Sequence, residues 1–276
     1  MSCSEPDVDD ETGSSQFPVD TAAREPGYLR AARIVILCLG AWMVLSTSAI
    51  LVLAELSGKP VFRAVIRMGS GLVFGWNVLG GVVMYLDRDR IRRVVLALPG
   101  AWPVKFVGFC TLLALIEEAI TTTLTNLAPF FGVAMGRAYI TASANYLDVV
   151  CHHSVIIFVP WFVGWAWMLS RWDFHPTMVF LIFGLTGTIA ETNFLTRNPA
   201  EIGMWVFVYG LMIYLPAYSL PAKRGARPPR WWHYPLAIFL PFPFVILLLP
   251  IEVTRSLLQL HPDPSSIHFP LIQMDP

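Results

Sequence analysis

The chain has 276 residues, of which 55% are apolar and 14% are charged, and its formal net charge at pH 7 is zero. A soluble domain of this length cannot bury so much apolar surface, whereas a protein that crosses a bilayer several times needs it. The lack of net charge gives no support to a nucleic-acid partner. We therefore predict an all-α, polytopic bundle of about seven transmembrane helices, surrounded by the lipid bilayer and without a nucleic-acid ligand.

The apolar segments divide the chain into one membrane domain and two tails. Residues 1–30 are predicted to form an acidic, disordered cytoplasmic tail, because this segment is rich in Ser, Asp, Glu and Pro and has no apolar signal-peptide core. Residues 31–255 form the predicted seven-helix domain, and residues 256–276 form a short exoplasmic tail. At about 20 apolar residues per crossing, the predicted crossings are roughly 33–56, 68–86, 104–127, 146–169, 177–195, 202–220 and 235–253.

The positions of Lys and Arg indicate the orientation of the bundle. Thirteen of the 19 basic residues flank the connections on the same side as the N-terminus, and six flank the connections on the opposite side. Because cytoplasmic loops carry the excess of basic residues, the N-terminus is predicted to be cytoplasmic and the C-terminus exoplasmic. The compact build and this charge bias favour the plasma membrane of a bacterium or archaeon.

The third predicted crossing contains the most informative residues. Glu117 and Glu118 interrupt an apolar run, and an ionised carboxylate in hydrocarbon is unfavourable by several kcal/mol or more unless it is paired, protonated or bound to a metal. At about 100° per residue, Glu118 lies within about 60° of several threonines, while Glu117 is turned one position away. These threonines are Thr111, Thr121, Thr122 and Thr125. Glu118 is therefore expected to head a polar stripe that faces the bundle interior.

The next two crossings carry further polar residues at a similar predicted depth. Asn145, Asp148 and His152 follow the spacing i, i+3 and i+7 on one helical face, and His153 points elsewhere. In the fifth crossing, small residues share a face with Glu191, and Asn193 follows. The small residues are Gly184, Gly187 and Thr188. Three consecutive helices are thus expected to bring Glu118, Asp148, His152 and Glu191 into one layer.

This set of side chains predicts two forms of acid–base chemistry. In the first, His152, Asp148 or Glu191, and one of the two adjacent glutamates hold a divalent metal such as zinc, and the remaining one of Glu117 and Glu118 acts as the general base. In the second, which needs no metal, a glutamate in a poorly hydrated site activates water and His152 transfers the proton. Supporting positions around the site are Thr122, Asn145, His153 and Asn193.

Adjacent glutamates followed by two polar helices resemble the CAAX-protease and bacteriocin-processing family of intramembrane peptidases, over roughly residues 110–195. That family carries EExxxR, then FxxxH, then HxxxN or HxxxD. In the first motif, this chain has Glu117 and Glu118 but Thr122 in place of the arginine. In the second, the residues four positions before His152 and His153 are Asp148 and Val149, where the family has Phe. In the third, the residue four positions before Asn193 is Ile189, where the family has a histidine. The resemblance implies hydrolysis of a membrane-embedded peptide or lipid substrate.

Two other classes of function fit the same residues. Buried Glu, Asp and His side chains at one depth also form proton relays and cation-coupled carriers. A non-catalytic scaffold subunit can use polar side chains to join its helices. At single positions the structural alternatives are a hydrogen-bonded, protonated Glu118, a structural pair of Asp148 with His152, and a solvated Glu191.

Overall fold

The computed structural model describes residues 26–191, 198–244 and 247, apart from the side chains of His152, His153 and Glu191. Every regular element in this part of the chain is a helix, so the all-α prediction is confirmed there. The first helix begins at Gly27, inside the predicted tail, because Pro26 precedes it and no further breaker interrupts the apolar run. The tail segments 1–25 and 256–276 lie outside the described residues.

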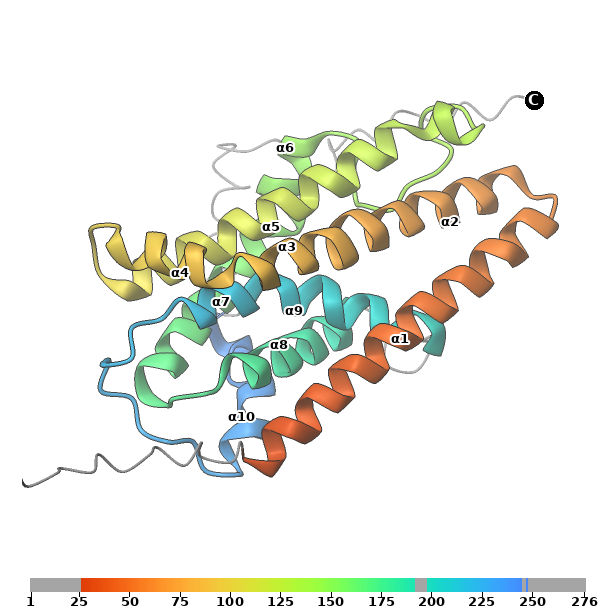
Figure 1. Ribbon diagram of the computed structural model, residues 1–276. Helices are drawn as coiled ribbons and strands as arrows, with labels where there is room; N and C mark the ends of the chain where they lie inside the picture. Colours follow the sequence, from red (N-terminus) through yellow and green to blue (C-terminus); the bar gives the residue numbers. More distant parts are fainter. Residues whose placement is uncertain (1–25, 192–197, 245–246, 248–276) are drawn as a thin grey trace, which may run out of the picture.

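The helices follow one another along the chain, several are interrupted, and the two longest described connections are residues 132–145 and 219–232 (Figure 1). The elements are α1 (Gly27–Leu56), α2 (Pro60–Leu72), η1 (Val73–Gly80), α3 (Gly81–Leu86), α4 (Arg88–Ala97), α5 (Trp102–Asn126), η2 (Ala128–Phe131), α6 (Tyr146–Asp148), η3 (Val149–His153), α7 (Val155–Arg171), α8 (Pro176–Glu191), η4 (Pro199–Glu201), α9 (Ile202–Tyr218) and α10 (His233–Phe239). The elements η1 and η3 are π-helical, whereas η2 and η4 are 3₁₀ turns.

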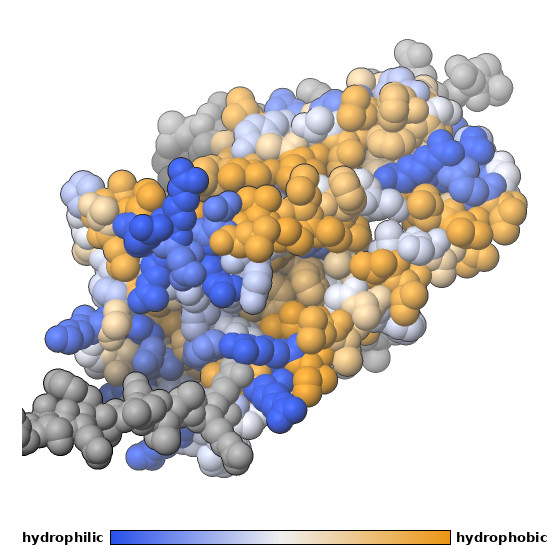
Figure 2. All heavy atoms as spheres, in the orientation of Figure 1, coloured by the Kyte–Doolittle hydropathy of each residue, from blue (hydrophilic) through white to orange (hydrophobic). Residues whose placement is uncertain are grey.

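Four helical segments are long and apolar enough to cross a membrane: Gly27–Leu56, Pro60–Leu86, Tyr146–Arg171 and Pro199–Tyr218. Only 11% of the apolar window of the first is buried inside the bundle, so this helix presents its apolar side chains outward. Figure 2 shows apolar side chains covering the middle of the visible face, with hydrophilic side chains gathered toward both ends. The chain is therefore a helical protein suited to a membrane.

The structure supports fewer crossings than the seven predicted from sequence. The third predicted crossing coincides with α5, which contains two buried carboxylates, and the fifth coincides with α8, which has 16 residues. Neither belongs to the four membrane-length apolar segments. The seventh predicted crossing starts as α10, and most of its second half lies outside the described residues. Seven crossings thus stay a prediction.

The core is built around the close antiparallel packing of α8 and α9. A Cβ atom on Gly184 would lie 2.5 Å from the carbonyl oxygen of Val206, and one on Gly187 would lie 2.2 Å from the ring of Tyr209. Real side chains do not approach so closely, so only glycine permits this spacing at both positions. The groove of small residues predicted for this helix is therefore confirmed at both glycines, and α9 fills it.

Several connections meet at one end of the bundle, which we call the basic end. Tyr218 at the end of α9 donates a hydrogen bond to Asp89 on α4 at 2.6 Å, and Arg224 donates to the carbonyl of Leu169 on α7 at 3.0 Å and also pairs with Asp173. The start of α1 joins the same end, because Tyr28 and the Tyr234 ring of α10 are 6.4 Å apart. The predicted cytoplasmic connections thus lie together.

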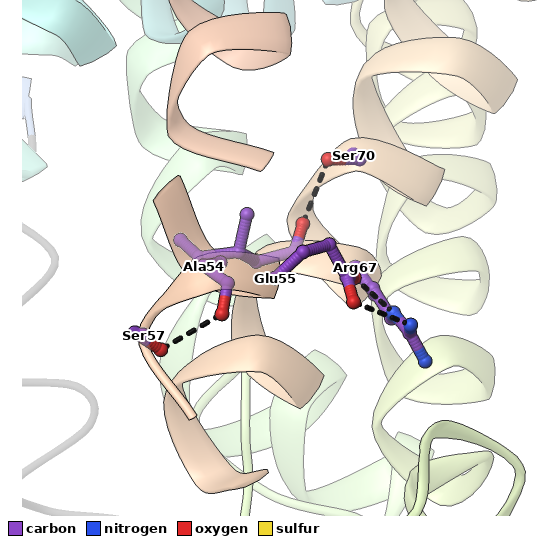
Figure 3. A network of polar contacts seen from close by, with 6 residues as sticks. Ala54, Glu55, Ser57, Arg67 and Ser70 are labelled. Carbon is purple, nitrogen blue, oxygen red and sulfur yellow. Dashed lines mark hydrogen bonds and ion pairs between the residues drawn. The ribbon is translucent and has the colours of Figure 1, made fainter. Parts of the chain in front are cut away.

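The turn between α1 and α2 lies at the opposite end and is held by polar contacts (Figure 3). Arg67 donates to both carboxylate oxygens of Glu55, at 2.7 and 2.9 Å. Ser57 donates to the carbonyl of Ala54 at 2.8 Å, which caps the last turn of α1. The two helices are therefore fixed as a hairpin from this end.

Candidate functional site

The two adjacent glutamates lie on the buried face of α5. Glu117 is 4% exposed and Glu118 is 5% exposed. The expected polar stripe is confirmed for the threonines that follow, since Thr121, Thr122 and Thr125 are also buried. Glu117, which was expected one position away from this stripe, is buried as well, because α2, α7 and α9 all pack on α5 and cover a wider sector than one stripe.

Hydroxyl groups surround the Glu118 carboxyl group. Thr121, one turn further along α5, donates to Oε2 of Glu118 at 3.1 Å. Thr141, from the segment between α5 and α6, donates to the same oxygen at 3.4 Å. These contacts fix the direction in which the Glu118 side chain points.

A cavity of about 700 Å³ opens beside both carboxyl groups. Glu117, Glu118 and Thr121 form its polar wall on α5, and Ser154 contributes a hydroxyl at the start of α7. Leu72 on α2 and Ala190 near the end of α8 also reach it. The cavity therefore has room for an organic group as well as water, next to two acidic side chains.

Much of the remaining wall of the cavity is aromatic. Phe158 and Trp161 come from α7, and Trp205 and Tyr209 come from α9. The rings of Trp205 and Tyr209 are stacked with centroids 6.1 Å apart, and Phe158 meets Tyr209 edge-on at 5.6 Å. The indole nitrogen of Trp161 is buried without a hydrogen-bond partner among the described residues. This wall suits an apolar chain or an apolar side chain.

Residues 132–145 form a segment that we call the covering loop, because it folds back along α5 over the cavity. The amide of Ile140 donates to the Thr125 hydroxyl at 3.3 Å, and Asn126 donates to the carbonyl of Ala144 at 2.8 Å. These bonds bring residues 139–142 to the cavity wall. Burial raises the pKa of the Tyr139 hydroxyl in this loop above its ordinary value, so it keeps its proton at neutral pH.

The structure separates Asn145 and Asp148 from this cavity. The side chain of Asn145 accepts a hydrogen bond from the amide of Leu147 at 3.0 Å, so it serves as the N-cap of α6. Asp148 is half-buried and does not line the cavity. The backbone is π-helical from Val149 to His153, so the face predicted from α-helical angles does not continue past Asp148.

Four predicted site residues lie wholly or in part outside the described structure. The side chains of His152, His153 and Glu191 lie outside the described residues, as does the whole of Asn193. Their predicted roles, as acid–base group, metal ligands or supporting positions, stay predictions. Thr122 is buried but does not line the cavity, and its hydroxyl has no hydrogen-bond partner in the described part of the chain.

The described side chains form no metal centre by themselves. Within residues 26–191 and 198–244, no three His, Cys, Asp or Glu side chains are placed to hold a metal ion. Two of the predicted zinc ligands, His152 and Glu191, fall outside that test, so the zinc site stays a prediction. Carboxyl, hydroxyl and indole groups are the chemistry that the cavity itself offers.

Two π-helical segments adjoin the cavity. The segment η1 follows Leu72, a lining residue, and η3 ends just before Ser154, another lining residue. In η1, Trp76 donates to the carbonyl of Val208 at 3.2 Å and Asn77 donates to the carbonyl of Met204 at 3.2 Å, so η1 is tied to α9. Such π segments are frequent at functional sites.

Sequence reasoning missed the side chains that complete the cavity. Thr141 and Tyr139 lie in a loop without periodicity, so no pattern connects them with Glu118. Trp161, Trp205 and Tyr209 lie in apolar helices, where an aromatic residue is most simply explained by packing. Of the two threonines that donate to Glu118, the sequence indicated only Thr121, because it follows Glu118 on the same helical face.

The fold and this site define a helical membrane protein with a buried pair of carboxyl groups in a partly aromatic cavity. The chain matches no protein-family model, no curated protein and no solved structure.

Proposed function

We propose that the chain is a plasma-membrane hydrolase that crosses the bilayer seven times, with a cytoplasmic N-terminus, and that it uses Glu118 to activate water against a membrane-embedded peptide or lipid. The observation that carries this proposal is the burial of Glu117 and Glu118 at the wall of the 700 Å³ cavity. Buried ionisable groups within a membrane bundle are most often functional. The partial resemblance to the CAAX-protease and bacteriocin-processing family agrees with this class of reaction.

In the proposed reaction, Glu118 removes a proton from water as the water oxygen attacks the carbonyl carbon of the scissile amide or ester. Thr121 and Thr141 orient the Glu118 carboxylate for this proton transfer. The protonated Tyr139 hydroxyl lines the same cavity and can donate to the developing oxyanion. Glu118 then returns the proton to the leaving nitrogen or oxygen, so that the carboxyl group is regenerated.

The aromatic wall indicates where the apolar part of the substrate binds. Phe158, Trp205 and Tyr209 line the same cavity as the two carboxyl groups. An acyl chain or an apolar side chain on these rings would place a neighbouring carbonyl group at the polar wall. This geometry favours an amphipathic substrate over a small, fully polar one.

The test compares wild-type protein with Glu118→Gln in liposomes that contain two probes, a quenched fluorescent peptide with one apolar crossing and a fluorogenic phospholipid ester. We expect wild type to hydrolyse at least one probe and Glu118→Gln to be slower by about 10²- to 10⁴-fold, because glutamine cannot accept the proton. Glu55→Gln is the matched control, since Glu55 lies at the α1–α2 turn and pairs with Arg67. Equal rates for wild type and Glu118→Gln would contradict the proposal.

A proton- or cation-coupled transporter is the second candidate, favoured by the two π-helical segments beside the cavity. The same liposomes distinguish it. A carrier would hydrolyse neither probe but would relax an imposed pH or cation gradient, and this flux would be lost in Glu118→Gln. If both variants are inactive in hydrolysis and flux and differ only in thermal stability, the polar residues serve a scaffold.

A further inference from the structure

A second cavity, of about 220 Å³, lies at the basic end between α4, the start of α5 and the end of α9. Leu96 closes it on α4, and Trp102, Lys105 and Phe106 form the α5 wall. Ser219 and Leu220 complete it just after α9. The cavity therefore combines one cationic and one hydroxyl side chain with apolar walls, and its α5 residues precede the two glutamates on the same helix.

Lys105 supplies the positive charge of this cavity. Its ammonium group donates to the carbonyls of Leu98 and Leu96, at 3.0 and 3.4 Å, at the end of α4. No carboxylate in the described part of the chain forms an ion pair with it. An ammonium group has three N–H donors, so these two carbonyls hold it in place while it can still donate to a ligand.

Ser219 supplies a hydroxyl to which no other described residue forms a hydrogen bond. The residue is 3% exposed, and its hydroxyl has no hydrogen-bond partner among the described residues. A buried polar atom in this state is unfavourable unless a ligand or water satisfies it. Because Ser219 lines the cavity, a polar ligand bound there would supply the missing partner of this hydroxyl.

The surroundings favour an anion at the membrane surface. The helix α4 has no buried residue and lies between α3, which ends at Leu86, and α5, which begins at Trp102. Two α4 guanidinium groups, those of Arg88 and Arg92, lie 5.8 and 5.6 Å from the ring of Tyr218, next to Ser219. Figure 2 shows hydrophilic side chains gathered on this part of the molecule. The amino end of α5, with its positive dipole end, also faces this region.

We propose that this cavity binds the phosphate headgroup of an anionic membrane lipid. Lys105 and Ser219 contact the phosphate oxygens, and the indole of Trp102 lies at the level of the headgroups. A volume of about 220 Å³ accommodates a headgroup but not acyl chains. The acyl chains therefore extend along the outside of α5, where Val104 and Leu112 are 72% and 51% exposed.

The experiment measures lipid retention by the full-length protein in mixed micelles of phosphatidylglycerol and phosphatidylcholine, read by native mass spectrometry. We expect wild type to retain phosphatidylglycerol in preference. Lys105→Gln should lower its occupancy by about tenfold or more, because a charged hydrogen bond is lost, and Ser219→Ala by about two- to tenfold. Lys105→Arg keeps the charge and should retain most of the binding, and Lys59→Gln at the opposite end should bind as wild type does.

Equal retention of both lipids by wild type would overturn the proposal, and so would unchanged phosphatidylglycerol retention in Lys105→Gln. A third contrary outcome is that millimolar glycerol phosphate displaces the lipid, so that the site does not prefer the lipid over the soluble phosphate. The last result would assign the site to a soluble phosphate. Ser219→Ala guards against a folding defect, since its hydroxyl makes no hydrogen bond in the described structure. A properly folded Ser219→Ala protein with unchanged retention would also count against it.

Discussion

Gly187 on α8 shows how strongly single residues constrain the cavity wall. A Cβ atom there would lie 2.2 Å from the ring of Tyr209, which lines the cavity. We expect Gly187→Ala to destabilise the protein by about 1–3 kcal/mol, because the α8–α9 pair must separate or Tyr209 must move. The midpoint of thermal unfolding in detergent measures this.

The matched control for this prediction is Gly108→Ala on α5. A Cβ atom on Gly108 meets nothing within 4 Å, so alanine there should leave the midpoint unchanged or raise it slightly through helix propensity. Equal unfolding midpoints for the two variants would show that the close approach at Gly187 does not limit stability.

At the residue scale, the site could be predicted from sequence only where helical periodicity applies. Glu117 and Glu118 stand out because carboxylates are costly in an apolar run, and their burial confirms that reasoning. Thr141 and Tyr139 could not be found, since tertiary folding of the covering loop brings them to Glu118. Asp148 was expected beside Glu118 on α-helical angles, and the π-helical turn after it changes that geometry.

At the scale of elements, the start of α10 contains a pH-sensitive contact. The Nδ1 atom of His233 accepts a hydrogen bond from the amide of Arg230 at 2.6 Å, and its ring lies 4.5 Å from that of Trp172. Burial, and then the charge of Arg230, lowers the pKa of His233 below its ordinary value of 6.5. The folded state therefore favours the neutral imidazole.

This shift makes the docking of α10 sensitive to acid. Between the lowered pKa and 6.5 the unfolded state binds more protons than the folded state, so stability falls as the pH drops below about 6.5. We expect the unfolding midpoint of wild type to decrease between pH 7.5 and pH 5 by more than that of His233→Asn, whose Oδ1 can accept the same amide hydrogen bond. Parallel decreases in both proteins would assign the acid sensitivity to other groups.

The extent of the helices was easier to predict than their regularity. Six of the seven predicted crossings coincide with helices in the described structure, because long apolar runs define their positions. The helix α4 was not predicted, since a short segment with four arginines does not resemble a crossing. The π-helical segments η1 and η3 were not predicted either, because apolar periodicity does not distinguish a π turn from an α turn.

At the scale of the whole molecule, the two ends of the bundle differ in chemistry. At the basic end, α4 and the segments after α7 and α9 are joined by side-chain hydrogen bonds and an ion pair. The opposite end carries the α1–α2 turn and the covering loop. There α9 begins level with the middle of α1, since Ser46 donates to the carbonyl of Ala200 at 2.7 Å. If the basic end is cytoplasmic, the carboxylate cavity lies toward the exoplasmic half.

This proposed orientation predicts which positions a membrane-impermeant maleimide reaches in intact bacterial cells. In a background in which the four native cysteines are replaced, Ser57→Cys at the α1–α2 turn should be labelled, whereas Asp87→Cys between α3 and α4 should be labelled only after permeabilisation. The reverse pattern would invert the orientation. Ser266→Cys tests the number of crossings, because an odd number places residue 266 on the same side as Ser57. Labelling of Ser266→Cys in intact cells would support seven crossings. Protection of Ser266→Cys would require an even number of crossings. In that case the proline-rich segment after α10 would return to the side from which it entered.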